Sequence, residues 1–408
     1  MQPTESSLGI MGNSPGPYAC VAAKSNKICF RGMHSELSNF VDTSAAAEID
    51  ARGRLVVPGF VDPHTHAIFA GSREMEMIDK LSGLSYLEIL RKGGGILKTV
   101  RDTRNASNLQ IKEQTRERLA RMLKCGTTTV EIKTGYGLDF KNEIRLLQIV
   151  NELGKMEDQD IVSTLLSAHA IPPEFSGQVD NYIEEVVKPT IDYASVNHLA
   201  QFCDVFMEED VFGRKQSRAI LQYARARNLG IKIHADEFSD LGGASLAAEL
   251  RVISADHLMK ASSEGIKALF QAGVIPVLLP GTSLSSFVAS YAKARDLIAN
   301  RCPIALASDL SPNSWIESMQ FIMSLACYSM QMTPAEALVA STINGAHAVG
   351  RASEVGSIEV GKKCDILIME LIRYEEMPYR IASNNVATVI KNGKVAKMFR
   401  AESSSLSL

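Results

Sequence analysis

The sequence lacks the features of a secreted, membrane or nucleic-acid-binding protein. The opening residues, MQPTESSLGIMGNSPGPY, have neither the basic start nor the apolar run of a signal peptide, and no apolar run reaches the ~20 residues that cross a bilayer. Its 7 cysteines form no C-x-x-C pair, which favours buried free thiols in a reducing compartment. With 43 basic and 46 acidic residues, the net charge of -3 is too balanced for charge-driven binding. We expect a cytoplasmic protein that binds neither nucleic acid nor membrane.

What the sequence does have is an alternation of short apolar strands and helices. Its 408 residues, 46% of them hydrophobic, are enough for a large core, and α/β barrels of this length often form one unit. Helical spacing marks 107–124, which Gly126 is placed to end, and also 217–227 and 262–272. Strand patterns occur in the stretch from Val56 that Pro63 ends, and at 127–133, 161–166, 202–206, 231–233, 251–254, 274–279 and 303–307.

Eight such strands predict a (β/α)₈ TIM-type barrel, in which helices cover a parallel sheet. A doubly wound open sheet is the alternative, but no G-x-G-x-x-G follows a strand, which weakens its dinucleotide-binding form. Further β patterns at 27–30, 47–50, 356–368 and 386–395 lie outside the alternation. We therefore expect a small β-sandwich built from both chain ends, residues 1–57 and 355–408, beside a metal-dependent barrel of residues 58–354.

Residues that can bind a metal follow several of these strands. His64 and His66 are two residues apart in extended chain, so their side chains can point to the same side. An isolated pair of this kind is more often solvated, but further candidates also follow apolar runs, namely His169, His234, His257 and Asp309. Because the carboxyl ends of barrel strands share one mouth, these groups predict a metal site there.

Several segments resemble the imidazolonepropionase family of histidine degradation, within the amidohydrolase superfamily. They are VPGFVDPHTHAIFAGSRE, GGGILKTVRDTR, GTTTVEIKTGYGL, SAHAIPPE, IKIHADEF, ISADHL, VLLPGT and IALASDL. The similarity runs from about Ile49 to the C-terminus. The H-x-H pattern is common to the superfamily, whereas GSRE, EIKTGYG and HADEF are specific to this branch.

This resemblance implies hydrolytic opening of 4-imidazolone-5-propanoate to N-formimino-L-glutamate, with one Zn²⁺ or Fe ion per chain. The implied metal ligands are His64, His66, His234 and Asp309. The implied substrate-binding residues are Arg73, Tyr86, Tyr136, His169, Glu237, Ser311, Asn313 and Ser314. Lys133 ends a strand where other superfamily members carry a metal-bridging carboxylated lysine, but in this branch the lysine bridges no metals.

Ring hydrolysis at a metal ion gives Glu237, His257 and Asp309 possible catalytic roles. A metal ion can lower the pKa of water towards ~7 and polarise the ring carbonyl, which the water then attacks. Glu237 is our candidate for carrying the proton to the departing ring nitrogen, with Asp309 a candidate through its non-ligating oxygen. His257 could stabilise the oxyanion or orient the water. Arg73 suits the propionate because a guanidinium binds a carboxylate through two parallel bonds.

The sequence departs from the family after Asp309. The family usually continues Asp-Phe-Asn-Pro-Gly-Ser-Ser-Pro-Thr-Glu, whereas this loop is one residue shorter and has Ser311 and Asn313 where an Asn and a Gly help to bind the ligand. The substrate fit of the loop through Trp315 and the native metal therefore stay open.

Other interpretations also stay open. Arg73 could instead pair with Glu74 or Glu76, the two tyrosines could be packing residues, and Gly93 to Gly95 could be a turn or a mobile lid. An aminohydrolase or deaminase of the same superfamily, acting on another nitrogen heterocycle, is the alternative enzyme. A non-catalytic scaffold is the other, although such a protein would be expected to have lost metal ligands. For the enzyme we expect a small-molecule substrate and a homodimer.

Overall fold

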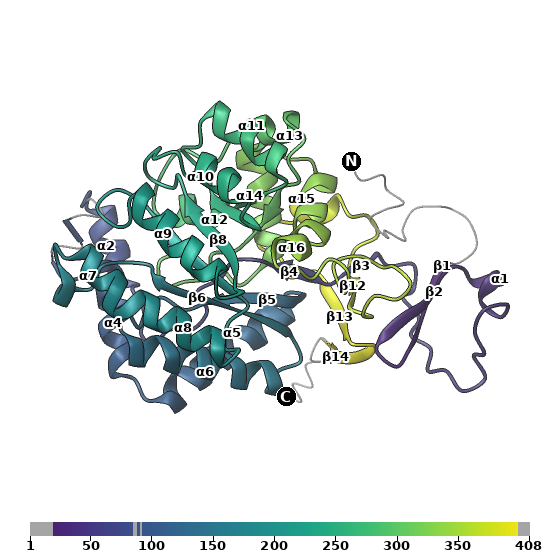
Figure 1. Ribbon diagram of the computed structural model, residues 1–408. Helices are drawn as coiled ribbons and strands as arrows, with labels where there is room; N and C mark the ends of the chain where they lie inside the picture. The colour runs from purple at the N-terminus through teal and green to yellow at the C-terminus, as the bar shows by residue number, and fades with distance from the viewer. Residues whose placement is uncertain (1–18, 85–87, 90–91, 399–408) are drawn as a thin grey trace, which may run out of the picture.

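The chain forms an eight-stranded parallel barrel with a small antiparallel β-domain at one end (Figure 1). The structure, a computed structural model, describes residues 19–84, 88–89 and 92–398. The barrel strands follow chain order: β4 (Phe60–Asp62), β5 (Thr127–Lys133), β6 (Asp160–Ala168), β7 (Phe202–Met207), β8 (Gly230–Ala235), β9 (Ser254–His257), β10 (Ile275–Leu278) and β11 (Ala305–Leu306). The predicted (β/α)₈ barrel is therefore confirmed.

Residues just after β11 close the sheet onto β4. Asp62 accepts hydrogen bonds from the backbone nitrogen and the hydroxyl of Ser308, at 3.1 and 2.5 Å. The backbone of His66 donates to Leu310, and that of Asp309 donates to His64, at 2.9 and 3.2 Å. These bonds join the first and last strands, so the sheet is not the open, doubly wound alternative.

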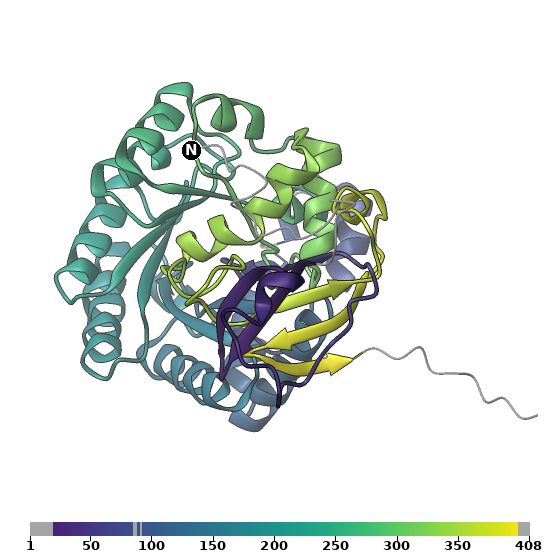
Figure 2. The ribbon, with the colours of Figure 1, turned by 90° about the vertical axis from the view of Figure 1, so that its right-hand side faces the viewer.

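Helices surround the barrel and connect its strands (Figures 1 and 2). They are α2 (Met75–Leu81), α4 (Gly95–Asn105), α5 (Asn108–Lys124), α6 (Phe140–Met156), α7 (Val179–Tyr182), α8 (Lys188–Val196), α9 (Arg214–Arg225), α10 (Gly243–Leu250), α11 (Ser263–Ala272), α12 (Pro280–Ser285), α13 (Ala294–Ala299), α14 (Met319–Met330), α15 (Pro334–Ala340) and α16 (Ile343–Ala348), with a 3₁₀ turn at Pro173–Phe175 and a π-helical turn at Ile183–Val187. Among the residues that the structure describes, no helix is both long and apolar enough for a bilayer.

The small domain combines both ends of the chain. An antiparallel sheet in the order β14-β13-β12-β3 joins β3 (Val56–Pro58) to β12 (Ile366–Met369), β13 (Val386–Lys391) and β14 (Lys394–Met398). Figure 2 shows the hairpin of β1 (Ala19–Lys24) and β2 (Lys27–Met33) beside this sheet. A bridge between Lys27 and Lys363 links the two. The short helix α1 (His34–Leu37) packs on the hairpin, whereas α17 (Glu376–Tyr379), between β12 and β13, packs against α14.

The apolar stretch before the histidine pair is two strands and not the single one expected. Gly59 separates β3 from β4: its backbone nitrogen donates to Asp365 of the small domain, whereas that of Phe60 donates to Gly126 of the barrel. A Cβ at Gly59 would lie 2.2 Å from the hydroxyl oxygen of Thr128, so only glycine fits at this crossing.

Other boundaries also differ from expectation. The pattern at 47–50 forms no strand, and β9 begins at Ser254, where the predicted strand ended. The segment 386–395 divides at Asn392 and Gly393, both with positive φ, into β13 and β14. Two helix starts were accurate: Ser107 forms a capping box with Gln110 at the start of α5, and Ser262 caps α11. The helix expected at 217–227 is α9, which begins three residues earlier and has no side-chain cap. Polar caps leave a clearer local signal than strand ends.

Candidate active site

Four side chains bring their acceptor atoms together at the mouth of the barrel. Nε2 of His66 lies 3.2 Å from Nε2 of His64 and 3.4 Å from Nε2 of His234. Oδ1 of Asp309 lies 3.6 Å from the Nε2 atoms of both His64 and His66. His64 and His66 follow β4, His234 lies in β8 and Asp309 follows β11. The barrel thus collects, at one point, residues that are far apart in sequence.

These spacings fit one tetrahedral metal ion. Metal–nitrogen bonds of ~2.1 Å place neighbouring donors ~3.4 Å apart in a tetrahedron. Burial, followed by repulsion from Lys133 for His64 and from His169 for His66, holds the pKa of both imidazoles well below the usual range. Neutral imidazoles and a carboxylate are the donors that zinc and iron sites use. The predicted metal ligands therefore lie together in a geometry that suits an ion.

Two buried aspartates orient two of these histidines. Nδ1 of His64 lies 2.6 Å from Oδ2 of Asp256, and Nδ1 of His234 lies 3.0 Å from Oδ2 of Asp204. A carboxylate at Nδ1 places the ring proton there and leaves the lone pair of Nε2 free for a metal. Sequence reasoning missed both aspartates. The available signal was an acidic residue inside an apolar strand, in FCDVFM and in SADH.

Lys133 joins these aspartates beneath the histidines. Its ammonium lies 2.8 Å from Asp204, 3.4 Å from Asp256 and 3.0 Å from Glu131, and all four side chains are fully buried. Burial lowers the pKa of Lys133, but the three carboxylates outweigh burial and raise it above the usual value. A lysine held as an ammonium is no nucleophile for CO₂, so these contacts do not suit a carboxylated, metal-bridging lysine. Lys232, also buried, binds Glu131 at 2.7 Å.

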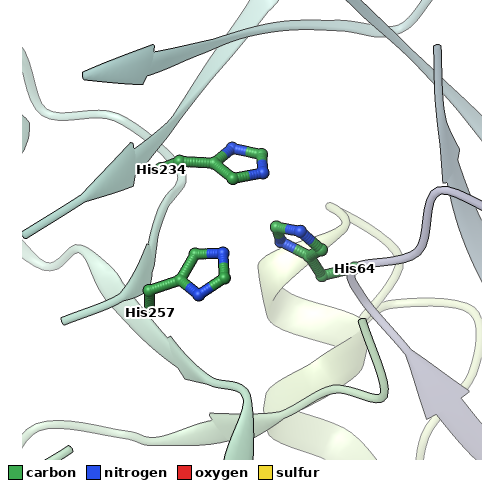
Figure 3. A group of neighbouring side chains, drawn as sticks. All are labelled: His64, His234 and His257. Carbon is green, nitrogen blue, oxygen red and sulfur yellow. The ribbon is translucent and has the colours of Figure 1, made fainter. Parts of the chain in front are cut away.

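His257 lies beside the four donors and faces a second carboxylate. Figure 3 shows its ring turned towards those of His64 and His234. Ligand atoms of these three histidines lie within 4.8 Å of one another, and Nε2 of His257 is 3.5 Å from Oε2 of Glu237. Burial, together with the charges of Asp309 and Glu208, raises the pKa of Glu237 well above its usual value. A carboxyl group with a raised pKa can both accept and return a proton near neutral pH.

Two further contacts hold the carboxylates in place. Thr282 donates its hydroxyl to Oδ2 of Asp309 at 2.6 Å, which leaves Oδ1 towards the histidines. Glu208 accepts the backbone N–H groups of Phe238 and Ser239 at 2.9 and 3.3 Å, immediately after Glu237. Sequence reasoning named neither Thr282 nor Glu208. Their roles come from loop conformations that no short motif encodes.

The backbone at the strand ends is itself constrained. Asp236, His257 and Asp309 have φ values of 52°, 77° and 53°, in the left-handed region that few residues other than glycine adopt. Such conformations persist only where surrounding contacts enforce them, and they gather at functional sites. For Asp236 the contacts are visible, because its carboxylate accepts the N–H groups of Gly243 and Ala244 at the start of α10.

Arg73 is buried near the donors and is not part of an ion pair among the described residues. Its exposed fraction is 9%, and its buried Nε has no hydrogen-bond partner. Glu74 binds the hydroxyl of Ser72, and Glu76 accepts the N–H of Gly95 at 2.7 Å, so neither glutamate serves the guanidinium. Arg73 is also close enough to help lower the pKa of Asp309 and of His169. Such a cation is suited to bind an anionic ligand.

Tyr136 and His169 form the aromatic side of the same mouth. The rings of His169 and His66 stack with centroids 4.8 Å apart, and Tyr136 lies 5.4 Å from His169. Burial, then the charge of His234, lowers the pKa of His169 to about 3, so this imidazole is neutral. Tyr86 lies outside the described residues.

The loop after Asp309 is held by its own side chains and by two helices. Ser311 and Ser314 exchange hydrogen bonds of 3.0 and 3.1 Å. The amide of Asn313 accepts from Lys80 of α2 at 2.9 Å and donates to Ser286, just after α12, at 3.2 Å. The structure thus shows what positions this loop, and both ends of the Asn313 amide already have partners.

Comparison with known proteins gives consistent results. Residues 55–396 match the model of the Amidohydrolase family. An imidazolonepropionase of Geobacillus kaustophilus is 47% identical over 393 residues, which cover 96% of this chain and 91% of the relative. That of Shouchella clausii is 45% identical over 378 residues, covering 92% and 84%.

Solved structures of the same fold are more distant in sequence. A 5-methylcytosine deaminase from Klebsiella pneumoniae has a TM-score of 0.76 at 17% identity and covers 96% of this chain and 98% of its own. An E. coli guanine deaminase has a TM-score of 0.73 at 14% identity and covers 93% of each chain. At these identities the likeness shows the fold alone.

Proposed function

The chain belongs to the amidohydrolase family and, within it, to the imidazolonepropionases, and on this premise we propose that it opens the ring of 4-imidazolone-5-propanoate. Water adds to the ring carbonyl, the carbonyl carbon–nitrogen bond breaks, and the product is N-formimino-L-glutamate. The observation that carries this assignment is Arg73, a buried cation without an ion-pair partner among the described residues, whose charge is close enough to lower the pKa of Asp309 and of His169. A propionate side chain is the anion that such a cation would bind.

We propose that His64, His66, His234 and Asp309 hold one Zn²⁺ or Fe ion. When bound, the ion would lower the pKa of water towards ~7 and polarise the ring carbonyl. The donor spacing of 3.2 to 3.6 Å and the lowered pKa values of His64 and His66 support this ligand set.

Proton transfer falls to Glu237 in this proposal. It takes the proton of the attacking water and returns it to the ring nitrogen as the bond breaks. The raised pKa of Glu237, due first to burial, suits both halves of that task. His257, 3.5 Å away, is placed to orient the water or to stabilise the oxyanion. Asp309 is the less suitable carrier, since its second oxygen already accepts from Thr282.

Substrate contacts complete the proposal. Arg73 binds the propionate, while Tyr136 and His169 line the ring and Tyr86 is assigned by resemblance alone. Ser311, Asn313 and Ser314 are proposed as the loop over the ligand. We also propose that the protein is a cytoplasmic homodimer. In this proposal residues 58–354 form the barrel domain, and residues 1–57 and 355–408 form the small domain.

The direct test follows the loss of imidazolone absorbance in the ultraviolet, with purified protein whose metal content is measured. We expect turnover that tracks the metal content and stops on chelation. Turnover without any transition metal would overturn the mechanism. An enzyme that ignores this substrate and deaminates another heterocycle would favour the alternative hydrolase.

Arg73 provides the sharper test of substrate identity. Loss of the charge-assisted contact in Arg73→Ala should lower kcat/KM at least ~10-fold while metal content stays the same. Arg73→Lys should recover only part, because an ammonium cannot reproduce the paired contact. An imidazolone without the propionate should be a poor substrate for wild type and no worse for Arg73→Ala. Equal discrimination by both enzymes would show that Arg73 does not bind the carboxylate.

A further inference from the structure

A buried arginine links the two loops that carry His66 and Asp309. Nη1 of Arg118, on α5, donates to the backbone oxygens of Ala67 and Phe69, each at 2.9 Å. Ala67 directly follows His66, so Arg118 holds the first ligand loop. No carboxylate forms an ion pair with this guanidinium among the described residues, although it is only 2% exposed. Its charge is met by aromatic rings instead.

The rings belong to Phe69 and Trp315. The guanidinium carbon of Arg118 lies 3.5 Å from the centroid of Phe69 and 5.1 Å from that of Trp315. The two rings meet edge to face, with centroids 5.2 Å apart. Cations and aromatic edges are both attracted to the negative face of a ring, so the three groups stabilise one another. Trp315 comes six residues after Asp309, in the second ligand loop.

A second contact fixes Trp315 from the other side. Its indole N–H donates to Glu317 at 3.2 Å, and both oxygens of Glu317 accept from Nε of Arg121, at 2.9 and 2.7 Å. Arg118 and Arg121 are one turn apart on α5, so a single helix holds both Trp315 and Glu317. Trp315 nevertheless has an exposed fraction of 44%, so burial in the core does not explain its position.

The cluster also reaches the aromatic wall of the proposed substrate site. Phe69 lies 6.2 Å from Tyr136 in an edge-to-face arrangement. A displaced Trp315 would thus affect Phe69 and Tyr136 on one side and the 311–314 loop on the other.

We propose that Trp315 is a positioning residue that sets the 309–315 loop against the 64–69 loop through Arg118 and Phe69. The proposal rests on the proposed function only where it concerns substrate affinity. An aromatic residue that packs on a buried cation thereby fixes the position of this loop. Its main effect falls on the substrate side of the site, because its loop carries Ser311 and Asn313 and because Phe69 contacts Tyr136, three residues proposed to bind the substrate.

Steady-state kinetics test the substrate side. Loss of the ring contacts in Trp315→Ala should raise KM about tenfold and change kcat by less than about threefold, with metal content unchanged. Trp315→Phe, which keeps a ring over Arg118, should stay within about threefold of the wild-type KM. Tyr379→Ala, an exposed aromatic on α17, is the matched control and should leave KM as it is. An unchanged KM in Trp315→Ala, or a Phe variant as poor as the Ala variant, would overturn the proposal.

Fluorescence tests the link between the loops without any substrate. The sequence has 1 tryptophan, Trp315, so the emission excited at the red edge of tryptophan absorption comes from this loop alone. Adding Zn²⁺, which has no redox chemistry, to metal-free protein should change the emission until one equivalent is bound. Arg118→Lys, which cannot reach both carbonyls and both rings, should weaken that response. Emission that does not respond while Zn²⁺ binds would overturn the coupling, whereas turnover results would bear separately on the proposed function.

Discussion

The two ends of the barrel both bury charge, but they neutralise it in different ways. At the end next to the small domain, Asp160 at the start of β6 binds Lys363 at 2.9 Å and Lys391 at 2.8 Å. Lys391 also binds Asp365 at 2.6 Å, so each carboxylate there has an ammonium. At the mouth, by contrast, Oδ1 of Asp309 and the Nε2 atoms of His64 and His66 have one another as neighbours and, in the part of the chain that the structure describes, no ammonium. One end is electrostatically complete within the chain, and the other is arranged for a cation.

The pKa shifts of the carboxylates show the same contrast. Burial raises the pKa of Asp160, but Lys391 and Lys363 outweigh burial and lower it overall. Burial raises the pKa of Asp309 to about 6, because the partially compensating hydrogen bond from Thr282 is not enough. The carboxylate that binds two ammonium groups thus has a lowered pKa, whereas the one that faces the histidines has a raised pKa.

Removing one donor should have the largest effect. His234→Ala takes away one of four ligands, and we expect loss of the ion and a fall in kcat of ~10³-fold or more, since several kcal/mol of electrophilic stabilisation are lost. Metal analysis and turnover measure this. The melting temperature should hardly fall, because the ligands line the mouth and not the core. His198→Ala, at an exposed turn, is the control, and an active, metal-free His234→Ala would contradict the ligand set.

Glu237→Gln should separate proton transfer from metal binding. The amide keeps the shape of the side chain but accepts no proton, so kcat should fall ~10²-fold or more with metal content intact. Glu209→Gln, an exposed neighbour, should behave like wild type. Near-normal turnover by Glu237→Gln would mean that Asp309 or His257, and not Glu237, transfers the proton.

Lys133→Met tests whether the charges beneath the ligands serve the metal or only the fold. It leaves Asp204 and Asp256 without their shared cation, and we expect metal affinity to fall ~10- to 100-fold. The control is Lys232→Met, since Lys232 binds Glu131 and the carbonyl of Pro63 but neither of those aspartates. Both variants should lose unfolding free energy, on the order of 3–5 kcal/mol. Equal losses of metal affinity in a chelator competition would mean that Lys133 supports only the fold.

The sequence was informative where chemistry follows a strong local pattern. His64, His66, His234 and Asp309 each follow or end an apolar run, and the barrel topology alone then brings them together. The helices expected from residues 107 and 262 were predicted equally well, and the structure shows a capping serine at the start of each. These features depend on contacts within a few residues or on the shared polarity of parallel strands.

The features that we did not predict from the sequence depend on contacts between segments that are far apart in the chain. Asp204 and Asp256 looked like polar interruptions of apolar strands, because their partner Lys133 lies on a third strand. The division at Gly59 depends on a close approach to Thr128. The position of Trp315 depends on a helix nearly two hundred residues earlier. No local pattern predicts pairings of that range.

The smallest effect should come from a substitution at the end of the barrel next to the small domain, where ion pairs already neutralise the buried charges. Asp160→Asn removes one acceptor, but Lys391 keeps Asp365 and Lys363 keeps Glu354, so the free energy of unfolding should fall by only about 1–2 kcal/mol at pH 7, with turnover unchanged. The folded state lowers the pKa of Asp160 below 3.8, so its stabilisation is complete above that pH and disappears as pH falls through the folded pKa.

Denaturant unfolding of wild type and Asp160→Asn should therefore differ at pH 7 and converge in acid. Glu249→Gln, which breaks an exposed pair with Arg218, is the control and should show almost no difference at either pH. A gap between wild type and Asp160→Asn that stayed constant into acid would mean that packing, and not the ion pairs, explains it.

The same measurement on Asp309→Asn in metal-free protein should give the opposite sign. The pKa of that carboxyl is raised to about 6, so removing it should stabilise the fold at pH 7 and lose this advantage as pH falls below 6. A charge that stabilises at one end of the barrel and destabilises at the other is what the comparison requires.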